Sequence, residues 1–322
     1  MLKGNFLTAA LIPTQSTVDH IVAELFFISL VLPSMVVIAA IAIPIAGAML
    51  LAIHRFWLKK KITILRKEWK SLAIIAALFA ATEFAWFDAV GRIGGGMTAL
   101  LSVPLEPVAI IIMSFFILNE KLRKPQIIGT CVVIFGIILS LDMAGTVSLY
   151  QIGIGEIEAM MAAFTGAIEV VLTVKFLSKY DEIECSAFIL IMTGAMLTGV
   201  ILANPSMMMG AHITTDWFWL LLFPFVPMFS FLVYYRGSMR IGASFTSILS
   251  AGSIMLTLVL QVIITYFGVP MTLPENMTFA IMGGIVSIVG IFIVFCKDIG
   301  RHKKESRQPL NPSTTPLLLQ AS

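Results

Sequence analysis

Several ionisable side chains lie within long apolar stretches of this sequence. Asp19, His20, Glu83 and Glu106 fall near the middle of such stretches. A carboxylate at the centre of a bilayer costs about 2.5–3.5 kcal/mol on insertion scales, so it persists only where it is paired, protonated or in contact with water. We therefore consider these residues candidates for binding a solute or a coupling proton.

The first apolar stretch is polar along one side. Gln15 and Asp19 are four residues apart, and the same spacing separates Ser16, His20 and Glu24. Residues four apart share a helix face, and the opposite side carries Leu, Ile, Val and Phe. The pattern predicts an amphipathic transmembrane helix that faces an aqueous cavity. An interfacial helix or a re-entrant segment is the alternative.

Glu83 shares a helix face with Trp86, Phe87 and Val90. A carboxylate beside aromatic rings can hold a cationic or amphipathic solute through charge and cation–π attraction. In the alternative interpretation, Trp86 packs against a neighbouring helix, and Glu83 pairs structurally with His20 or with a hydroxyl group.

Glu106 lies between Pro104 and Pro107. Proline lacks a backbone donor and frees a carbonyl group one turn earlier in a helix. A carboxyl group beside such a kink can bind a proton or a substrate, or it can form a structural hydrogen bond that holds the kink.

A hydrogen-bonding stripe is predicted where Ser250, Ser253, Thr257 and Gln261 follow one another at intervals of three or four. Such residues also mediate helix packing in membranes. Tyr234 is a candidate gate or interfacial anchor. The candidate substrate-binding or coupling residues are Gln15, Asp19, His20, Glu83, Trp86, Glu106, Tyr234, Ser250, Ser253, Thr257 and Gln261.

The composition indicates a polytopic helical membrane protein. Apolar residues make up 59% of the 322 residues and charged residues 12%, whereas a soluble domain averages about 45–50% and about 25%. A soluble globule could not cover this excess with a polar surface, which excludes a soluble enzyme, a nucleic-acid module and a disordered scaffold. The three cysteines show no metal or disulfide spacing.

Ten segments are predicted to span a membrane, each with about 20 residues or slightly fewer. If the N-terminus is cytoplasmic, every Lys and Arg except Arg92 lies on the cytoplasmic side, as the positive-inside rule requires. Both termini are then cytoplasmic. The predicted spans are Phe6–Ile28, Pro33–Ile53, Lys70–Val90, Met97–Leu118, Gln126–Ala144, Ile154–Phe176, Ala187–Ala203, Trp217–Tyr235, Phe245–Phe267 and Phe279–Cys296.

An internal repeat divides the chain. Residues 92–102 match residues 240–250 with six of eleven positions identical, and Gly129 and Gly136 mirror Gly283 and Gly290. Because each unit has an odd number of five helices, the two copies must have opposite orientations, as in many secondary transporters. The predicted division is 1–150 and 151–296 for the two repeats and 297–322 for a disordered cytoplasmic tail.

Small residues are expected to allow close helix approach at Gly129/Gly136, Ala195/Gly199 and Gly283/Gly290.

At several of these motifs the sequence resembles the drug/metabolite transporter superfamily, of the EamA-like ten-helix kind. The resemblance is carried by the run 94–102, by Leu105-Glu106-Pro107, by Asn119-Glu120-Lys121-Leu122 and by the glycines of 127–139. It implies a transporter of small organic solutes, with a central cavity lined by helices one, three, four, six, eight and nine.

The sequence lacks a Gly-x-x-x-x-Gly-Lys-Ser/Thr loop, so we expect transport to be driven by an ion gradient, by exchange or by the solute gradient. An acidic lining favours a neutral, zwitterionic or cationic metabolite such as an amino acid or an amine, with protons as a candidate coupling ion. A channel or lipid scramblase on the same fold is the alternative. A membrane-embedded enzyme is disfavoured because His20 is the single histidine within a predicted span.

The expected partners are a small-molecule solute and membrane lipid, without nucleic acid, metal or cofactor. The expected assembly is a monomer or a homodimer. The family resemblance favours a multi-pass protein of a prokaryotic cytoplasmic (inner) membrane.

Overall fold

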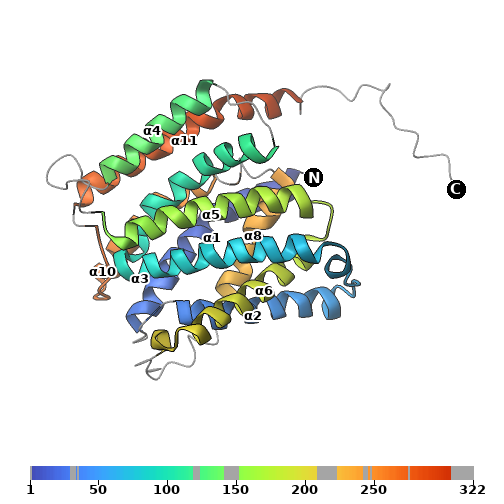
Figure 1. Cartoon of the computed structure of the whole chain (residues 1–322). Coiled ribbons are helices and arrows are strands. Elements are labelled where there is room, and N and C mark those ends of the chain that lie inside the picture. The colour runs from blue at the N-terminus through green and yellow to red at the C-terminus, as the bar shows by residue number, and fades with distance from the viewer. Residues whose placement is uncertain are drawn as a thin grey trace.

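The computed structural model describes residues 2–29, 34, 36–118, 124–140, 152–208, 223–241, 246, 249–274 and 276–305, and within these residues it contains helices and no strand. The predicted all-α fold is confirmed to that extent. The α-helices, shown in Figure 1, are α1 (Leu2–Ser29), α2 (Val36–Ala52), α3 (Ile64–Leu118), α4 (Lys124–Ser140), α5 (Ile154–Leu177), α6 (Glu182–Ala203), α8 (Phe225–Ile241), α10 (Gly252–Tyr266) and α11 (Met277–Glu305).

Four helices in this part of the chain are long and apolar enough to cross a membrane. They are Val36–Trp57, Lys67–Ile117, Ile154–Leu177 and Glu182–Ala203, and shorter apolar helices cover Ile127–Ser140, Gly252–Tyr266 and Met277–Ile293. This composition agrees with the predicted multi-pass membrane protein.

Helix α3 covers two of the predicted spans, Lys70–Val90 and Met97–Leu118. No loop separates the two spans, and the helix is interrupted between them at Gly94. Gly94 has φ 77° and ψ 163°, a left-handed conformation that glycine adopts readily because it lacks Cβ. The chain reverses its direction at this vertex, and α5 packs against α3 (Figure 1). The reversal places Glu83 and Glu106 on two opposed arms of one element.

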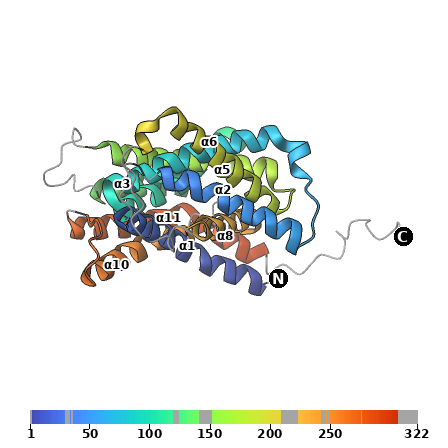
Figure 2. The same ribbon diagram turned by 90° about the horizontal axis from the view of Figure 1, so that it is seen from below.

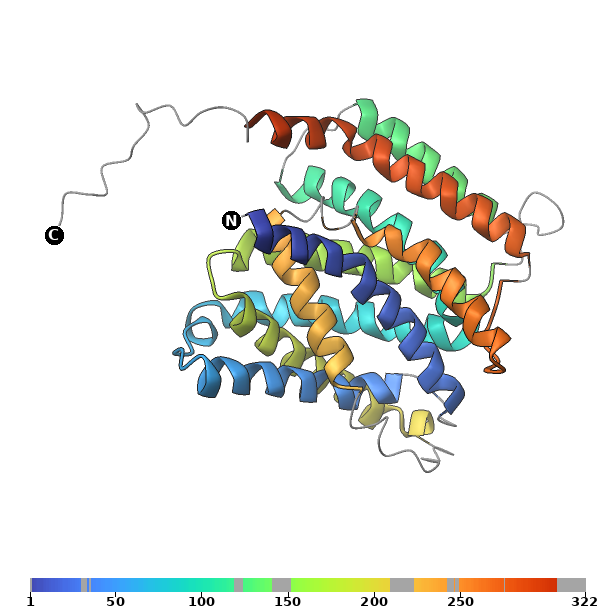
Figure 3. The ribbon, with the colours of Figure 1, turned by 180° about the vertical axis from the view of Figure 1, so that it is seen from behind.

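Helix α1 packs within the bundle. It lies between α8 and α10 and also contacts α3 (Figure 3). Gln15, Ser16, His20 and Glu24 are buried, which is the side predicted to be polar. These contacts favour the predicted amphipathic span over an interfacial helix.

Two predicted helix ends differ from the structure. Helix α8 continues past Tyr235 to Ile241, and α11 continues past Cys296 to Glu305. The predicted disordered tail therefore begins as helix, since Lys, Arg and Glu are good helix formers. The predicted span from Trp217 begins outside the described residues, as does the remainder of the tail, 306–322.

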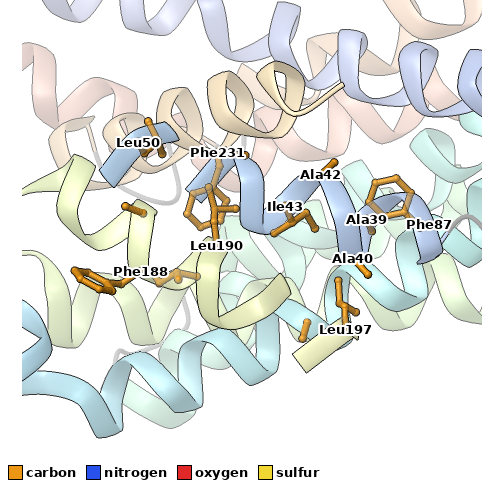
Figure 4. Close-up of a cluster of buried hydrophobic side chains, with 14 of the residues drawn as sticks. Ala39, Ala40, Ala42, Ile43, Leu50, Phe87, Phe188, Leu190, Leu197 and Phe231 are labelled. Atoms are coloured by element: carbon orange, nitrogen blue, oxygen red, sulfur yellow. The ribbon is translucent and has the colours of Figure 1, made fainter. Parts of the chain in front are cut away.

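Helices α2 and α6 pack closely around a cluster of buried apolar side chains (Figure 4). A Cβ atom at Gly194 would lie 2.3 Å from Cδ of Pro44, and one at Gly47 would lie 2.8 Å from the carbonyl oxygen of Ala187. Glycine at both positions lets the helices touch through their backbones. In Figure 2, α2 lies between α6 and α1, and α8 contacts both α2 and α6.

Helices α4 and α11 meet through the predicted glycines. A Cβ at Gly136 would lie 2.7 Å from the carbonyl oxygen of Gly283, and one at Gly290 would lie 2.9 Å from that of Gly129. The predicted contact at Ala195/Gly199 is wrong, because both residues are exposed and a Cβ at Gly199 would meet nothing within 4 Å.

These contacts predict opposite effects of one substitution at two helical glycines. Gly136→Ala should lower the free energy of unfolding by about 1–3 kcal/mol, because the added methyl group overpacks a backbone contact. Gly199→Ala should leave stability unchanged or raise it by up to about 1 kcal/mol, because alanine has the higher helix propensity. Thermal unfolding in detergent measures both. A loss of similar size in both variants would contradict the packing described here.

The loops after α2 and α5 meet at the end of the bundle where α1 begins (Figure 1). Nζ of Lys60 lies 2.6 Å from Asp181, which also accepts hydrogen bonds from the N–H groups of Ile183 and Glu184. Burial disfavours the ionised Asp181 carboxyl, but Lys60 and the Glu184 N–H outweigh it, so the pKa of Asp181 lies below its usual value. Asp181 is therefore the N-cap of α6, and its ion pair with Lys60 joins this end of α6 to the loop after α2.

Candidate functional site

A cavity of about 210 Å³ lies at the centre of the bundle. Residues of α1, of both arms of α3, of α5 and of α8 line it, together with Ser250, which precedes α10. These elements correspond to the six predicted lining helices. Leu190 of α6 and Phe223 complete the wall.

Eight of the eleven predicted residues line this cavity. They are Gln15, Asp19, His20, Glu83, Trp86, Glu106, Tyr234 and Ser250. Ser253, Thr257 and Gln261 lie outside it, buried along α10. Oγ of Ser253 lies 3.0 Å from Oγ of Ser16, so the predicted stripe faces α1 over most of its length and reaches the cavity at Ser250.

The cavity lining is acidic. It contains the carboxyl groups of Asp19, Glu83, Glu106 and Glu169, and none of the residues found to line it is Lys or Arg. Glu83 lies close enough to Asp19 for charge repulsion, and Glu169 lies within electrostatic reach of Glu106 and of Glu83. The four carboxyl groups therefore form a continuous electrostatic network.

Hydroxyl groups of α8 bind three of these carboxyl groups. Oγ of Ser230 donates to Asp19 over 2.5 Å. The hydroxyl of Tyr234 donates to Glu106, and the hydroxyl of Tyr235 donates to Glu169.

Helix α8 thus contributes donors to acceptors on three other helices. Neutral hydroxyls satisfy hydrogen bonds of these acids without neutralising their charge.

Glu83 differs from the other three acids. Among the described residues, none donates a hydrogen bond to its carboxyl group. His20, its proposed structural partner, is engaged elsewhere: its Nδ1 lies 2.7 Å from the carbonyl oxygen of Ser16, and its Nε2 accepts a bond of 3.3 Å from Nε1 of Trp86. This arrangement assigns the proton of the neutral imidazole to Nδ1. The Glu83 carboxyl is therefore left to face the cavity.

Gln15 is a second cavity-lining group without a partner. Its side chain is only 4% exposed, and it forms no hydrogen bond with the part of the chain that the structure describes. Buried amides in proteins are normally hydrogen-bonded. An unpartnered amide in a cavity wall is a group that a bound ligand would satisfy.

Aromatic rings form much of the remaining wall. Trp86 stands edge-on to His20 with ring centroids 5.1 Å apart, and Phe231 stacks on Tyr235 at 4.2 Å. Phe79 also lines the cavity. Carboxyl groups beside aromatic faces are typical of sites for organic cations. The described residues include no group of three or more side chains placed to hold a metal ion.

Glu24 connects α1 to the Gly94 vertex of α3 and to α10, outside the cavity lining. Its carboxyl group is 1% exposed and accepts bonds from the N–H of Gly95 over 2.8 Å and from Nε2 of Gln261 over 2.5 Å. A third bond comes from the N–H of Thr272. Gln261 therefore binds Glu24 instead of facing the cavity, which explains its position outside the lining.

Sequence reasoning did not select six polar lining residues, which are Ser16, Thr82, Ser102, Glu169, Ser230 and Tyr235. Glu169 meets the same criterion as Glu83, since it is an acid in an apolar stretch, and it is 2% exposed. Tyr235 adjoins a selected residue, but consecutive residues of a helix point in different directions. No signal in the sequence distinguishes Ser230 from other helical serines.

Comparisons with known proteins show which proteins this chain resembles. Residues 24–141 match the model of the EamA-like transporter family. An uncharacterized transporter of Synechocystis sp. is 25% identical over 278 residues, which cover 82% of this chain and 77% of that protein.

One solved crystal structure superimposes with a TM-score of 0.66 at 15% identity and covers 94% of this chain and 99% of that chain, which shows a shared fold. The resemblance carried by the sequence motifs is thereby confirmed: the chain matches the EamA-like transporter family over residues 24–141, and the match indicates a membrane transporter.

Proposed function

We propose that this protein is a secondary transporter that carries a small organic cation across a membrane by alternating access. The observation that supports this proposal is the acidic cavity, which has four carboxyl groups and no Lys or Arg among the residues found to line it. A cation gains from these charges in a site with little water, whereas an anion is repelled.

The proposed architecture is ten transmembrane helices in two inverted units, 1–150 and 151–296, with both termini cytoplasmic. Two contacts support it. Helix α2 packs on α6, and α4 packs on α11, and these are the second and fifth helices of each proposed unit. The cytoplasmic membrane of a prokaryote is the proposed location, and a monomer or a homodimer is the proposed assembly.

Protons are the proposed coupling ion. When the cation leaves, the carboxyl groups of Asp19, Glu83, Glu106 and Glu169 remain in one cavity, and none of the residues found to line it is Lys or Arg. Binding protons relieves the repulsion between these carboxyl groups. Exchange of protons for the cation would then couple the two gradients.

Uptake into proteoliposomes tests the proposed function. Three solutes of similar size and permanent charge provide the comparison: butyltrimethylammonium, the zwitterion 4-(trimethylammonio)butyrate and butanesulfonate. We expect saturable uptake of the cation above that of protein-free liposomes, accelerated when the lumen is acidic.

Preferred uptake of butanesulfonate would overturn the proposal. Flux that does not saturate would indicate a channel, and flipping of a fluorescent lipid would indicate a scramblase.

A further inference from the structure

We propose that the cavity is built for a cation with two charges, a short diamine, with one ammonium group bound at each arm of α3. This inference rests on the proposed transport function and specifies the substrate class. Its basis is the arrangement of the acids and of two cavity groups, Glu83 and Gln15, to which no described residue forms a hydrogen bond.

Each arm of α3 carries one cavity acid, and we group the four acids into two pairs by these arms: Asp19 with Glu83, and Glu169 with Glu106. Glu169 also lies within electrostatic reach of Glu83, so the two pairs adjoin. Glu83 is eleven residues before Gly94, and Glu106 is twelve residues after it. With a helical rise of about 1.5 Å per residue, the two side chains lie at similar distances from the vertex. Each arm of α3 therefore contributes one acid at a comparable depth in the cavity.

The first pair has hydrogen-bond acceptors that no described residue uses. Among the described residues, no donor reaches the Glu83 carboxyl. The Gln15 amide, 4% exposed, also has no partner. A carboxylate and an amide oxygen together accept the N–H groups of one ammonium ion. Trp86, three positions after Glu83 on the same arm, supplies an aromatic face for its charge.

The second pair can accept another ammonium ion. Tyr234 donates one hydrogen bond to Glu106, and Tyr235 donates one to Glu169. A carboxylate has about four acceptor positions, so both acids retain capacity for N–H donors.

None of the residues found to line the cavity is a Lys or Arg that would hold a carboxylate group of a substrate, which argues against an amino acid in this orientation.

The cavity size suits a short diamine. A volume of about 210 Å³ has room for at least about seven water molecules at about 30 Å³ each. A diamine with four carbon atoms has a similar number of heavy atoms. The apolar part of the lining, which includes Ala163 and Val103, suits the methylene chain.

Binding to the full-length protein in detergent tests this inference by isothermal titration calorimetry at neutral pH. The probes are 1,4-diaminobutane and butylamine, which share a four-carbon chain and differ by one ammonium group. We expect the diamine to bind about tenfold more tightly or better, because charge-assisted hydrogen bonds add at the second pair. Glu106→Gln should bring the ratio of the two affinities towards one. Glu156→Gln, on α5 outside the cavity lining, should preserve the ratio.

The outcomes separate the two proposals. Butylamine binding as tightly as the diamine would overturn the inference and leave the proposed cation transport in place. Failure of both amines to bind would overturn both. The comparison in the unsubstituted protein decides these cases even if a variant does not fold. A ratio that Glu106→Gln leaves unchanged in a folded variant would also overturn the assignment of the second pair.

Discussion

Replacing Glu83 by glutamine should abolish most uptake of butyltrimethylammonium by proteoliposomes. The substitution preserves the shape of the side chain and removes its charge. In a site with little water, loss of one partner of a charge pair costs about 2–5 kcal/mol, and each 1.4 kcal/mol corresponds to about tenfold in affinity. We therefore expect uptake at a low cation concentration to fall by about 30-fold or more.

Glu156→Gln is the matched control for this experiment. Glu156 is also a helical glutamate, but it lies outside the cavity lining. Both variants should elute as the unsubstituted protein does in size-exclusion chromatography. Uptake by a folded Glu83→Gln protein within a factor of about two of the control would show that Glu83 does not bind the cation.

Replacing Glu24 by alanine should cause the largest loss of stability. The Glu24 carboxyl accepts bonds from Gly95, Gln261 and Thr272, and its removal leaves three donors without that acceptor, two of them in buried bonds. Each unsatisfied donor costs about 1–3 kcal/mol. We expect the free energy of unfolding to fall by about 3 kcal/mol or more, measured by thermal unfolding in detergent.

Glu156→Ala is the control for the stability loss expected of Glu24→Ala. Glu156→Ala removes a glutamate for which the structure shows no hydrogen bond or ion pair with the described residues, and surface substitutions of this kind change stability by about 0.5 kcal/mol or less. If Glu24→Ala were no more destabilising than Glu156→Ala, the three hydrogen bonds would not hold the vertex against α1 and α10.

The acids of the cavity could be identified from the sequence because they conflict with their surroundings. Asp19, Glu83 and Glu106 each interrupt an apolar stretch, and the energetic cost of such a charge implies a compensating environment. The structure places all three in one cavity. The four-residue spacing of α1 likewise indicated which side of that helix would be polar.

The partners of these acids could not be predicted. Helical periodicity identifies a face but does not specify what lies opposite it, so Gln261 was assigned to the cavity although it binds Glu24. The hydroxyl donors Ser230 and Tyr235 lie more than 60 residues from the acids that they bind. Such contacts depend on how helices pack, which a single sequence does not encode in a readable pattern.

The hydrogen bonds between α8 and the cavity acids also connect the two proposed units. On the proposed division near residue 150, two acceptors, Asp19 and Glu106, belong to the first unit, and their donors, Ser230 and Tyr234, belong to the second. A pair of identical units could form these bonds only if each unit carried both the acceptors and the donors. On that division, neither unit alone carries both members of these two bonds, and the single chain supplies the two units in equal number.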